Sequence, residues 1–159
     1  MKFRARAAAI IFNDNDELLM VLHKHPRTGE KWWTIPGGGL EIGECAKDAI
    51  VREVREESGI ECVTENLVYV RELIDEDNDR HYIELFFTAR AVSYDIYTGT
   101  DPELPVQYIQ KTAFLSEKQI RELNVNVFPE VLRDRFWDDL KGGFAGHTVY
   151  LGQHRFIKK

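Results

Sequence analysis

The first forty residues alternate between apolar and polar stretches in a pattern that predicts β-strands. Residues 4–12 and 17–23 are rich in apolar and β-branched side chains, and the sequence "NDND" separates them. Because Asn and Asp favour turns, we predict a β-hairpin here. A short strand follows at "WWTI", residues 32–35, and it ends at a proline and three glycines.

The period of the apolar positions changes at residue 45. From Cys45 to Ser58 the apolar residues recur every three or four positions, which predicts a helix with one apolar face. Gly59 follows directly, and glycine is the usual residue for a left-handed helix cap. We therefore predict that the helix ends at Ser58.

The remaining hundred residues contain strand patterns followed by helical ones. We predict strands over residues 62–74 and 81–94, a loop over 97–107, a strand over 108–114, a helix opening at Ser116, a helix over 129–140 and a strand over 147–157. Ser116 and Gln119 have the spacing of a capping box. The apolar stripe of the 129–140 helix indicates core or a subunit interface. The whole pattern predicts a mixed α/β domain in which helices cover a sheet.

Three glutamates lie within one turn of the 45–58 helix: Glu53, Glu56 and Glu57. Two carboxylates about 5 Å apart repel each other by roughly 3 kcal/mol at an effective dielectric near 20. One interpretation is a solvated helix face on which Arg52 pairs with Glu56. The other is that the glutamates converge on a hard divalent cation, for which carboxylate oxygens are suitable ligands.

The surrounding residues complete a known pattern. It comprises nine positions with fixed spacing: Gly38, Glu44, Arg52, Glu53, Val54, Glu56, Glu57, Gly59 and Ile60. In these residues the chain strongly resembles the Nudix hydrolase family, whose box has the same residues at the same spacing. The resemblance implies an α/β/α sandwich with a mixed β-sheet and the box as loop-helix-loop. The chain length predicts one domain over residues 1–159; the resemblance covers a core at about 4–123 and leaves an extension at about 124–159.

The resemblance also implies a reaction, which is hydrolysis of a nucleoside diphosphate linked to another moiety, by water attack at phosphorus. It implies that Glu53, Glu56, Glu57 and the carbonyl of Gly37 bind one to three Mg²⁺ or Mn²⁺ ions. Arg52 would orient a glutamate through a charge-assisted pair. Glu44 could brace the loop against the helix. The alternative is an inactive module that binds a nucleotide without cleaving it.

A general base is harder to assign from the sequence. Some relatives use a loop carboxylate outside the box, and the loop before residue 108 offers Asp101 and Glu103. Each could equally belong to a solvated acidic turn, and we also keep Glu103 as a candidate substrate contact. Gln107 and Gln110 stand where many relatives carry a glutamate. That difference favours Glu56 or Glu57 as the base.

Aromatic and basic residues outside the box are further candidates for binding a nucleotide. Adjacent strand residues face opposite sides, so one tryptophan should lie in the core and the other near the site, where it could stack on a base. Trp33 matches the position of the family's tryptophan, and we place it in the core and Trp32 near the site. Arg27 is a candidate phosphate contact. Several other basic residues are more simply solvated: Lys24, Arg71, Arg80 and Lys111. The five histidines, His23 and His25 among them, are interpreted as structural or surface residues.

Composition limits the partners. The net charge of −6 argues against binding of extended DNA or RNA, and the apolar runs are too short to cross a membrane. The two cysteines, Cys45 and Cys62, have neither a disulfide nor a metal-ligand pattern. We therefore expect a cytoplasmic protein with a small nucleotide substrate. A homodimer is possible.

Overall fold

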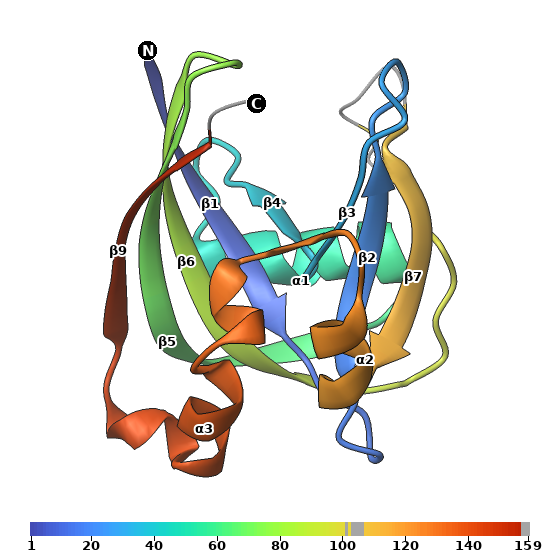
Figure 1. The fold of residues 1–159 in the computed structure, drawn as a ribbon. Helices are drawn as coiled ribbons and strands as arrows, with labels where there is room; N and C mark the ends of the chain where they lie inside the picture. Colours follow the sequence, from blue (N-terminus) through green and yellow to red (C-terminus); the bar gives the residue numbers. More distant parts are fainter. Residues whose placement is uncertain (101, 103–106, 157–159) are drawn as a thin grey trace.

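The structure is a computed structural model that describes residues 1–100, 102 and 107–156. Its larger sheet has five strands in the order β4-β1-β6-β5-β9, seen on the left and at the back of Figure 1. The bounds are β1 (Lys2–Ile10), β4 (Gly37–Gly39), β5 (Cys62–Asp75), β6 (Arg80–Ala91) and β9 (Val149–Phe156). Strand β1 runs parallel to β6 and antiparallel to β4, so the sheet is mixed.

The second sheet has four strands in the order β7-β2-β3-β8. Its bounds are β2 (Leu18–Lys24), β3 (Lys31–Thr34), β7 (Ile109–Leu115) and β8 (Asn126–Phe128). Strand β2 is antiparallel to β3 and β7, while β3 and β8 run parallel, so this sheet is also mixed. The two sheets diverge towards one end of the molecule, where the β2–β3 and β5–β6 turns lie (Figure 1).

Helices cover the strands on two opposite sides. One apolar cluster joins helix α1 (Ala46–Ser58) to the sheets through Ala49, Ile50 and Val54. A second cluster joins the sheets to the C-terminal helices through buried side chains such as Ile120 and Phe136. Those helices are α2 (Glu117–Glu122), α3 (Phe136–Lys141) and the 3₁₀ segments η1 (Glu130–Arg133) and η2 (Gly143–Gly146). The predicted α/β/α sandwich is therefore confirmed.

The predicted hairpin over residues 4–23 is wrong. Strands β1 and β2 belong to different sheets, and the bridge between Phe12 and Leu18 is isolated. The "NDND" segment does turn the chain, since the amide of Asn13 donates to the carbonyl of Glu17. Strand β1 nevertheless pairs in parallel with β6 along its whole length, and its second half is buried through Ala7, Ala9 and Ile10.

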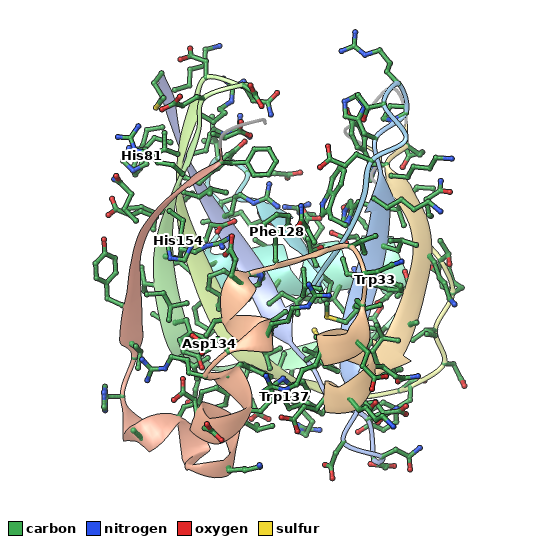
Figure 2. The ribbon with its side chains drawn as sticks, viewed as in Figure 1. Trp33, His81, Phe128, Asp134, Trp137 and His154 are labelled. Atoms are coloured by element: carbon green, nitrogen blue, oxygen red, sulfur yellow. The ribbon has the colours of Figure 1, made fainter. Side chains whose placement is uncertain are left out.

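The predicted helix over residues 129–140 is divided into η1 and α3. Asp134 has φ −128° and ψ −116°, which no helix can accommodate. The indole of Trp137 then donates to the carbonyl of Leu132 at 2.9 Å across the break. Figure 2 labels Asp134 and Trp137 in this segment. Leu132 and Phe136 are almost fully buried, so the predicted apolar stripe does contribute to the core.

The other predicted helices and strands are present among the described residues, while the predicted loop over 97–107 lies partly outside them. Strands β5 and β6 pair across an acidic turn, Gly59 caps α1 with φ +73°, and Ser116 and Gln119 form the predicted capping box. Cys45 and Cys62 are free thiols; burial raises the pKa of Cys62 to about 11. None of the helices in the described part of the chain is long and apolar enough to cross a membrane.

Candidate active site

Two glutamates of α1 are buried against the fold. Glu53 is 6% exposed and Glu57 is 4% exposed, and they lie one above the other because they are four residues apart. The side chain of Glu56 retains 26% of its exposure. The interpretation of this helix face as a solvated one is therefore wrong for Glu53 and Glu57. Ionisable groups are seldom buried without a partner, so both carboxylates should have partners in the fold.

Arg52 connects these glutamates to the loop before the helix. Its Nε and Nη2 donate to the two carboxylate oxygens of Glu44 at 2.8 and 3.0 Å, and Nη1 donates to Oε1 of Glu53 at 2.8 Å. It also donates to the carbonyl of Gly39 at 3.1 Å and to Glu56 at 3.4 Å. The hydrogen bond from Arg52 lowers the pKa of Glu44. The pairs expected of Arg52 and Glu44 are thus present, and they fix the orientation of Glu53.

The glycine turn lies in direct contact with both buried carboxylates. The amide of Gly37 donates to Oε1 of Glu57 at 3.3 Å. A Cβ atom on Gly38 would lie only 2.2 Å from Oε1 of Glu53. Strand β4 can approach α1 this closely only because Gly38 has no side chain. Backbone groups of the turn and side-chain oxygens of the helix therefore line the same small region.

A second segment, which the sequence analysis did not connect with the box, holds the end of α1. The amides of Gly99 and Thr100 donate to the carbonyls of Glu57 and Glu56 at 2.8 and 3.1 Å. The hydroxyl of Thr112 donates to the carbonyl of Glu57 at 3.0 Å. These contacts satisfy carbonyls that the helix end would leave unpaired. The candidate bases Asp101 and Glu103 follow in this loop but lie outside the described residues.

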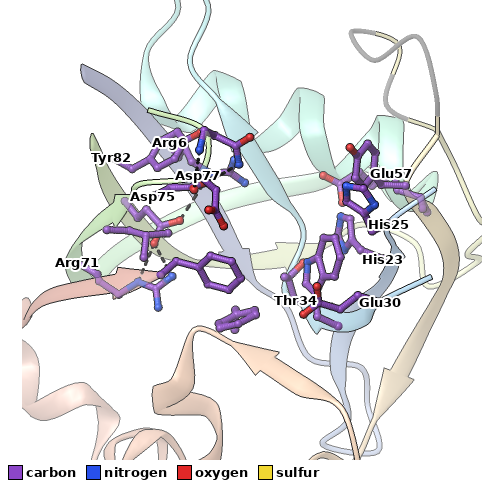
Figure 3. A pocket seen from close by; sticks show the side chains of 18 residues that line it. Arg6, His23, His25, Glu30, Thr34, Glu57, Arg71, Asp75, Asp77 and Tyr82 are labelled. Atoms are coloured by element: carbon purple, nitrogen blue, oxygen red, sulfur yellow. Dashed lines mark hydrogen bonds and ion pairs between the residues drawn. The ribbon is translucent and has the colours of Figure 1, made fainter. Parts of the chain in front are cut away.

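A pocket of about 470 Å³ opens between the two sheets, next to Glu57. Figure 3 shows its two walls. One wall comes from the larger sheet and the β5–β6 turn, with Arg6, Arg71, Asp75, Asp77, Tyr82 and Glu84. The other comes from the smaller sheet and the β2–β3 loop, with His23, His25, Glu30, Trp32, Thr34 and Tyr108. The buried carboxylates and a cavity large enough for a nucleoside are therefore adjacent.

Aromatic rings form much of the second wall. His23 stacks on Trp32 with ring centroids 5.5 Å apart and planes within 6°. Tyr108 lies 6.3 Å from Trp32 and 5.5 Å from His25. Trp32 lines the pocket while Trp33 is buried in the core, as the alternation of the strand predicts.

His23 at the end of β2 and His25 in the loop that follows it both lie at the pocket. His23 and His25 were expected to be structural or surface residues; His25 accepts hydrogen bonds from the amides of Arg27 and Thr28 in its loop, and both side chains also line the pocket. The available signal was their spacing of two residues, which places both side chains on one face of a strand. His23 also pairs in register with Trp32 of β3. That register, which the sequence does not reveal, brings the histidine to the candidate site.

The predictions for the basic residues have different outcomes. Arg71 is not solvated: its side chain is 3% exposed and its Nε donates to Glu84 at 2.7 Å. It is buried because it points from β5 into the space between the sheets, where acidic partners neutralise it. Lys111 is exposed, as expected. Arg27 is exposed and is not among the described residues that line the pocket.

The donors near the glycine turn suit a hard cation. The three glutamates and the Gly37 carbonyl offer only oxygen ligands, which Mg²⁺ and Mn²⁺ prefer. In the described part of the chain, however, no three His, Cys, Asp or Glu side chains already converge as a metal-binding group. Instead Oε1 of Glu53 accepts from Arg52 and Oε1 of Glu57 accepts from Gly37. These oxygen donors therefore have the chemistry that a site for Mg²⁺ or Mn²⁺ requires.

The fold and site define a class of α/β/α proteins in which a glycine turn and a glutamate-rich helix face a pocket between two sheets. Comparison with known families identifies that class, because a family model of the NUDIX domain matches residues 2–134. The chain belongs to the Nudix hydrolase family. Enzymes of this family act on small nucleotide substrates and generally use divalent metal ions.

Individual relatives agree with the family. An uncharacterized Nudix hydrolase of Bacillus subtilis is 36% identical over 100 residues, which cover 62% of this chain and 59% of that protein. An ADP-ribose pyrophosphatase of Methanocaldococcus jannaschii is 31% identical over 117 residues, covering 71% and 68%. A solved NUDIX hydrolase from Nitrosomonas europaea superposes with a TM-score of 0.71 at 27% identity, covering 94% of each chain.

Proposed function

We propose that this protein hydrolyses the diphosphate linkage of a nucleoside triphosphate or of a small nucleotide derivative. The observation that carries the proposal is the burial of Glu53 and Glu57 against the glycine turn, beside a pocket with an aromatic wall. Arg52 and the amide of Gly37 offset part of the repulsion between them, but two buried carboxylates beside a pocket still point to a functional requirement. A diphosphate with its counter-cations meets that requirement.

In the proposed mechanism, a divalent cation bound by Glu53, Glu56, Glu57 and the Gly37 carbonyl would neutralise the diphosphate and lower the pKa of the attacking water. Arg52 keeps Glu53 in place through its 2.8 Å hydrogen bond. We assign the proton of that water to Glu56, whose side chain is the most exposed of the three; Glu57 is the alternative base. The amides of Gly99 and Thr100 keep the last turn of α1 fixed while charge develops.

The nucleoside would occupy the pocket between the sheets. Its base offers a flat π-face, and the parallel rings of His23 and Trp32 provide a matching surface. The pocket leads from this aromatic wall to Glu57, so a bound nucleoside would direct its 5′-phosphates towards α1. The relative named as an ADP-ribose pyrophosphatase makes ADP-ribose one compound to test.

The function can be tested with a panel of nucleoside triphosphates, nucleoside diphosphates and nucleotide sugars, with and without Mg²⁺. Phosphate and pyrophosphate release are measured, coupled to phosphatase and pyrophosphatase. We expect Mg²⁺-dependent release from at least one compound. Tight binding with no release from any compound would instead favour the alternative of a nucleotide-binding module.

The aromatic wall gives a second prediction. Trp32→Ala should raise KM for the preferred nucleotide about tenfold with little change in kcat, because stacking of a base on an aromatic ring is worth ~1–3 kcal/mol. Trp32→Phe keeps a ring and should restore most of the affinity. Steady-state kinetics on both variants make the comparison. An unchanged KM for Trp32→Ala would place the base elsewhere.

A further inference from the structure

Three charged side chains cross the inner face of the larger sheet in a continuous ladder. Arg6 of β1, Glu84 of β6 and Arg71 of β5 are direct register partners, since Glu84 lies opposite both arginines. The guanidinium of Arg71 contacts Oε2 of Glu84 at 2.6 Å, and Nε of Arg6 lies 3.6 Å from Oε1. All three side chains line the pocket, and Figure 3 shows Arg6 and Arg71 on the wall opposite His23.

The C-terminal part of the chain extends this ladder by two residues. Nη1 of Arg71 pairs with Glu130 of η1, and Nδ1 of His154 on β9 lies 3.3 Å from the same carboxylate (Figure 2). The buried guanidinium of Arg71 is therefore shared between two carboxylates. It keeps N–H groups for hydrogen bonding but carries little uncompensated positive charge.

The described residues that line the pocket have a negative net charge. Among the described residues that line it, five are acidic and two are arginines, with the histidines taken as neutral. The acidic residues are Glu30, Glu57, Asp75, Asp77 and Glu84, and the arginines are Arg6 and Arg71. Even if Glu57 is assigned to the cation site and Asp77 is left out of the balance, three carboxylates of the described lining remain for two guanidinium groups. A wall of this kind offers donors and acceptors to a neutral polar group and repels an anion.

We propose that this pocket selects nucleotides by charge: it accepts an uncharged nucleoside and rejects one that carries a further phosphate, for example on its 3′-hydroxyl. The inference rests on the proposed function, because it assumes that the nucleoside lies in the pocket and the 5′-phosphates lie at α1. Glu130 acts as a positioning residue that neutralises Arg71 from the C-terminal segment. The preferred substrates are then mononucleotides and neutral nucleotide conjugates, and a 5′-triphosphorylated RNA chain is excluded by the phosphate that follows its first nucleoside.

The direct test measures binding, so it does not depend on turnover. A nucleoside 5′-monophosphate and the matching 3′,5′-bisphosphate are titrated into the full-length protein with Mg²⁺, using calorimetry. We expect the monophosphate to bind at least about tenfold more tightly, because a further phosphate monoester, with a charge of about −1.5 to −2, beside several carboxylates changes the interaction energy by a few times the thermal energy. Equal or tighter binding of the bisphosphate would overturn the inference, and so would failure of both ligands to bind.

Substitutions then locate the origin of the selectivity. Glu84→Gln and Glu130→Gln keep a hydrogen-bond acceptor but leave more positive charge on Arg71, so each should reduce the preference by about tenfold. Glu122→Gln is the matched control, because it removes the same charge from an exposed position on α2 and should leave the preference unchanged. A similar loss in all three variants would indicate net charge rather than the ladder and would contradict the proposal.

The two proposals can fail separately. Selective binding without hydrolysis of any nucleotide would refute the enzymatic function and leave the charge selection standing. Hydrolysis of mononucleotides and of 5′-triphosphorylated RNA at similar kcat/KM would support the enzyme and refute the selection. If Glu130→Gln fails to fold, as judged by circular dichroism, the wild-type comparison and Glu84→Gln still decide the outcome.

Discussion

Replacing Glu57 by glutamine should reduce kcat by at least about a thousandfold, because metal-assisted charge stabilisation of several kcal/mol is lost when its ligand is neutralised. Glutamine has the same shape and can still accept the hydrogen bond from the Gly37 amide. It also removes one of two mutually repelling carboxylates. The fold and its thermal stability should therefore be retained or improved while the activity disappears.

The measurement combines steady-state kinetics with circular dichroism and thermal unfolding. Asp48→Asn serves as the control because Asp48 is an exposed carboxylate on the same helix, and this variant should keep its activity. Calorimetric titration with Mg²⁺ in the presence of nucleotide gives an independent readout. A folded Glu57→Gln protein with normal kcat would show that this carboxylate does not act in the reaction.

How much of the fold the sequence can predict depends on how local each signal is. The bounds of α1 follow from its own apolar period and from Gly59, and the β5–β6 pair follows from two adjacent strands and one turn. Strand β1 could not be placed in the same way. Its parallel partner β6 begins seventy residues after the end of β1, and no local pattern encodes a pairing at that distance.

The same distinction applies to the site. The spacing of the box identifies Glu53 and Glu57, because residues four apart on a helix must lie close together. The position of Arg71 depends on Glu84 and Glu130, which lie 13 and 59 residues away. A solvated arginine is the better expectation until those partners are known. The residues that line the pocket therefore emerge only from the register of the sheets and the path of the C-terminal segment.

The glycine turn provides the second large effect. Gly38→Ala should lower kcat by about a hundredfold or more, because its Cβ would lie 2.2 Å from Oε1 of Glu53 and displacement of a catalytic group by about 1 Å costs on the order of 10²-fold. Glu53 is also held by Arg52 at 2.8 Å, so its carboxylate cannot move without disturbing that pair. The substitution adds one methyl group and changes no charge.

Gly39→Ala is the comparison that separates this clash from a general stiffening of the turn. The nearest atom to a Cβ on Gly39 is Nη2 of Arg4, at 3.3 Å, at the flexible end of its side chain. That guanidinium can move away, so the loss in kcat should be far smaller than for Gly38→Ala. Mg²⁺ titrations of both variants show whether the clash acts through the cation site. Equal losses in the two variants would mean that backbone flexibility of the turn, and not its contact with Glu53, limits turnover.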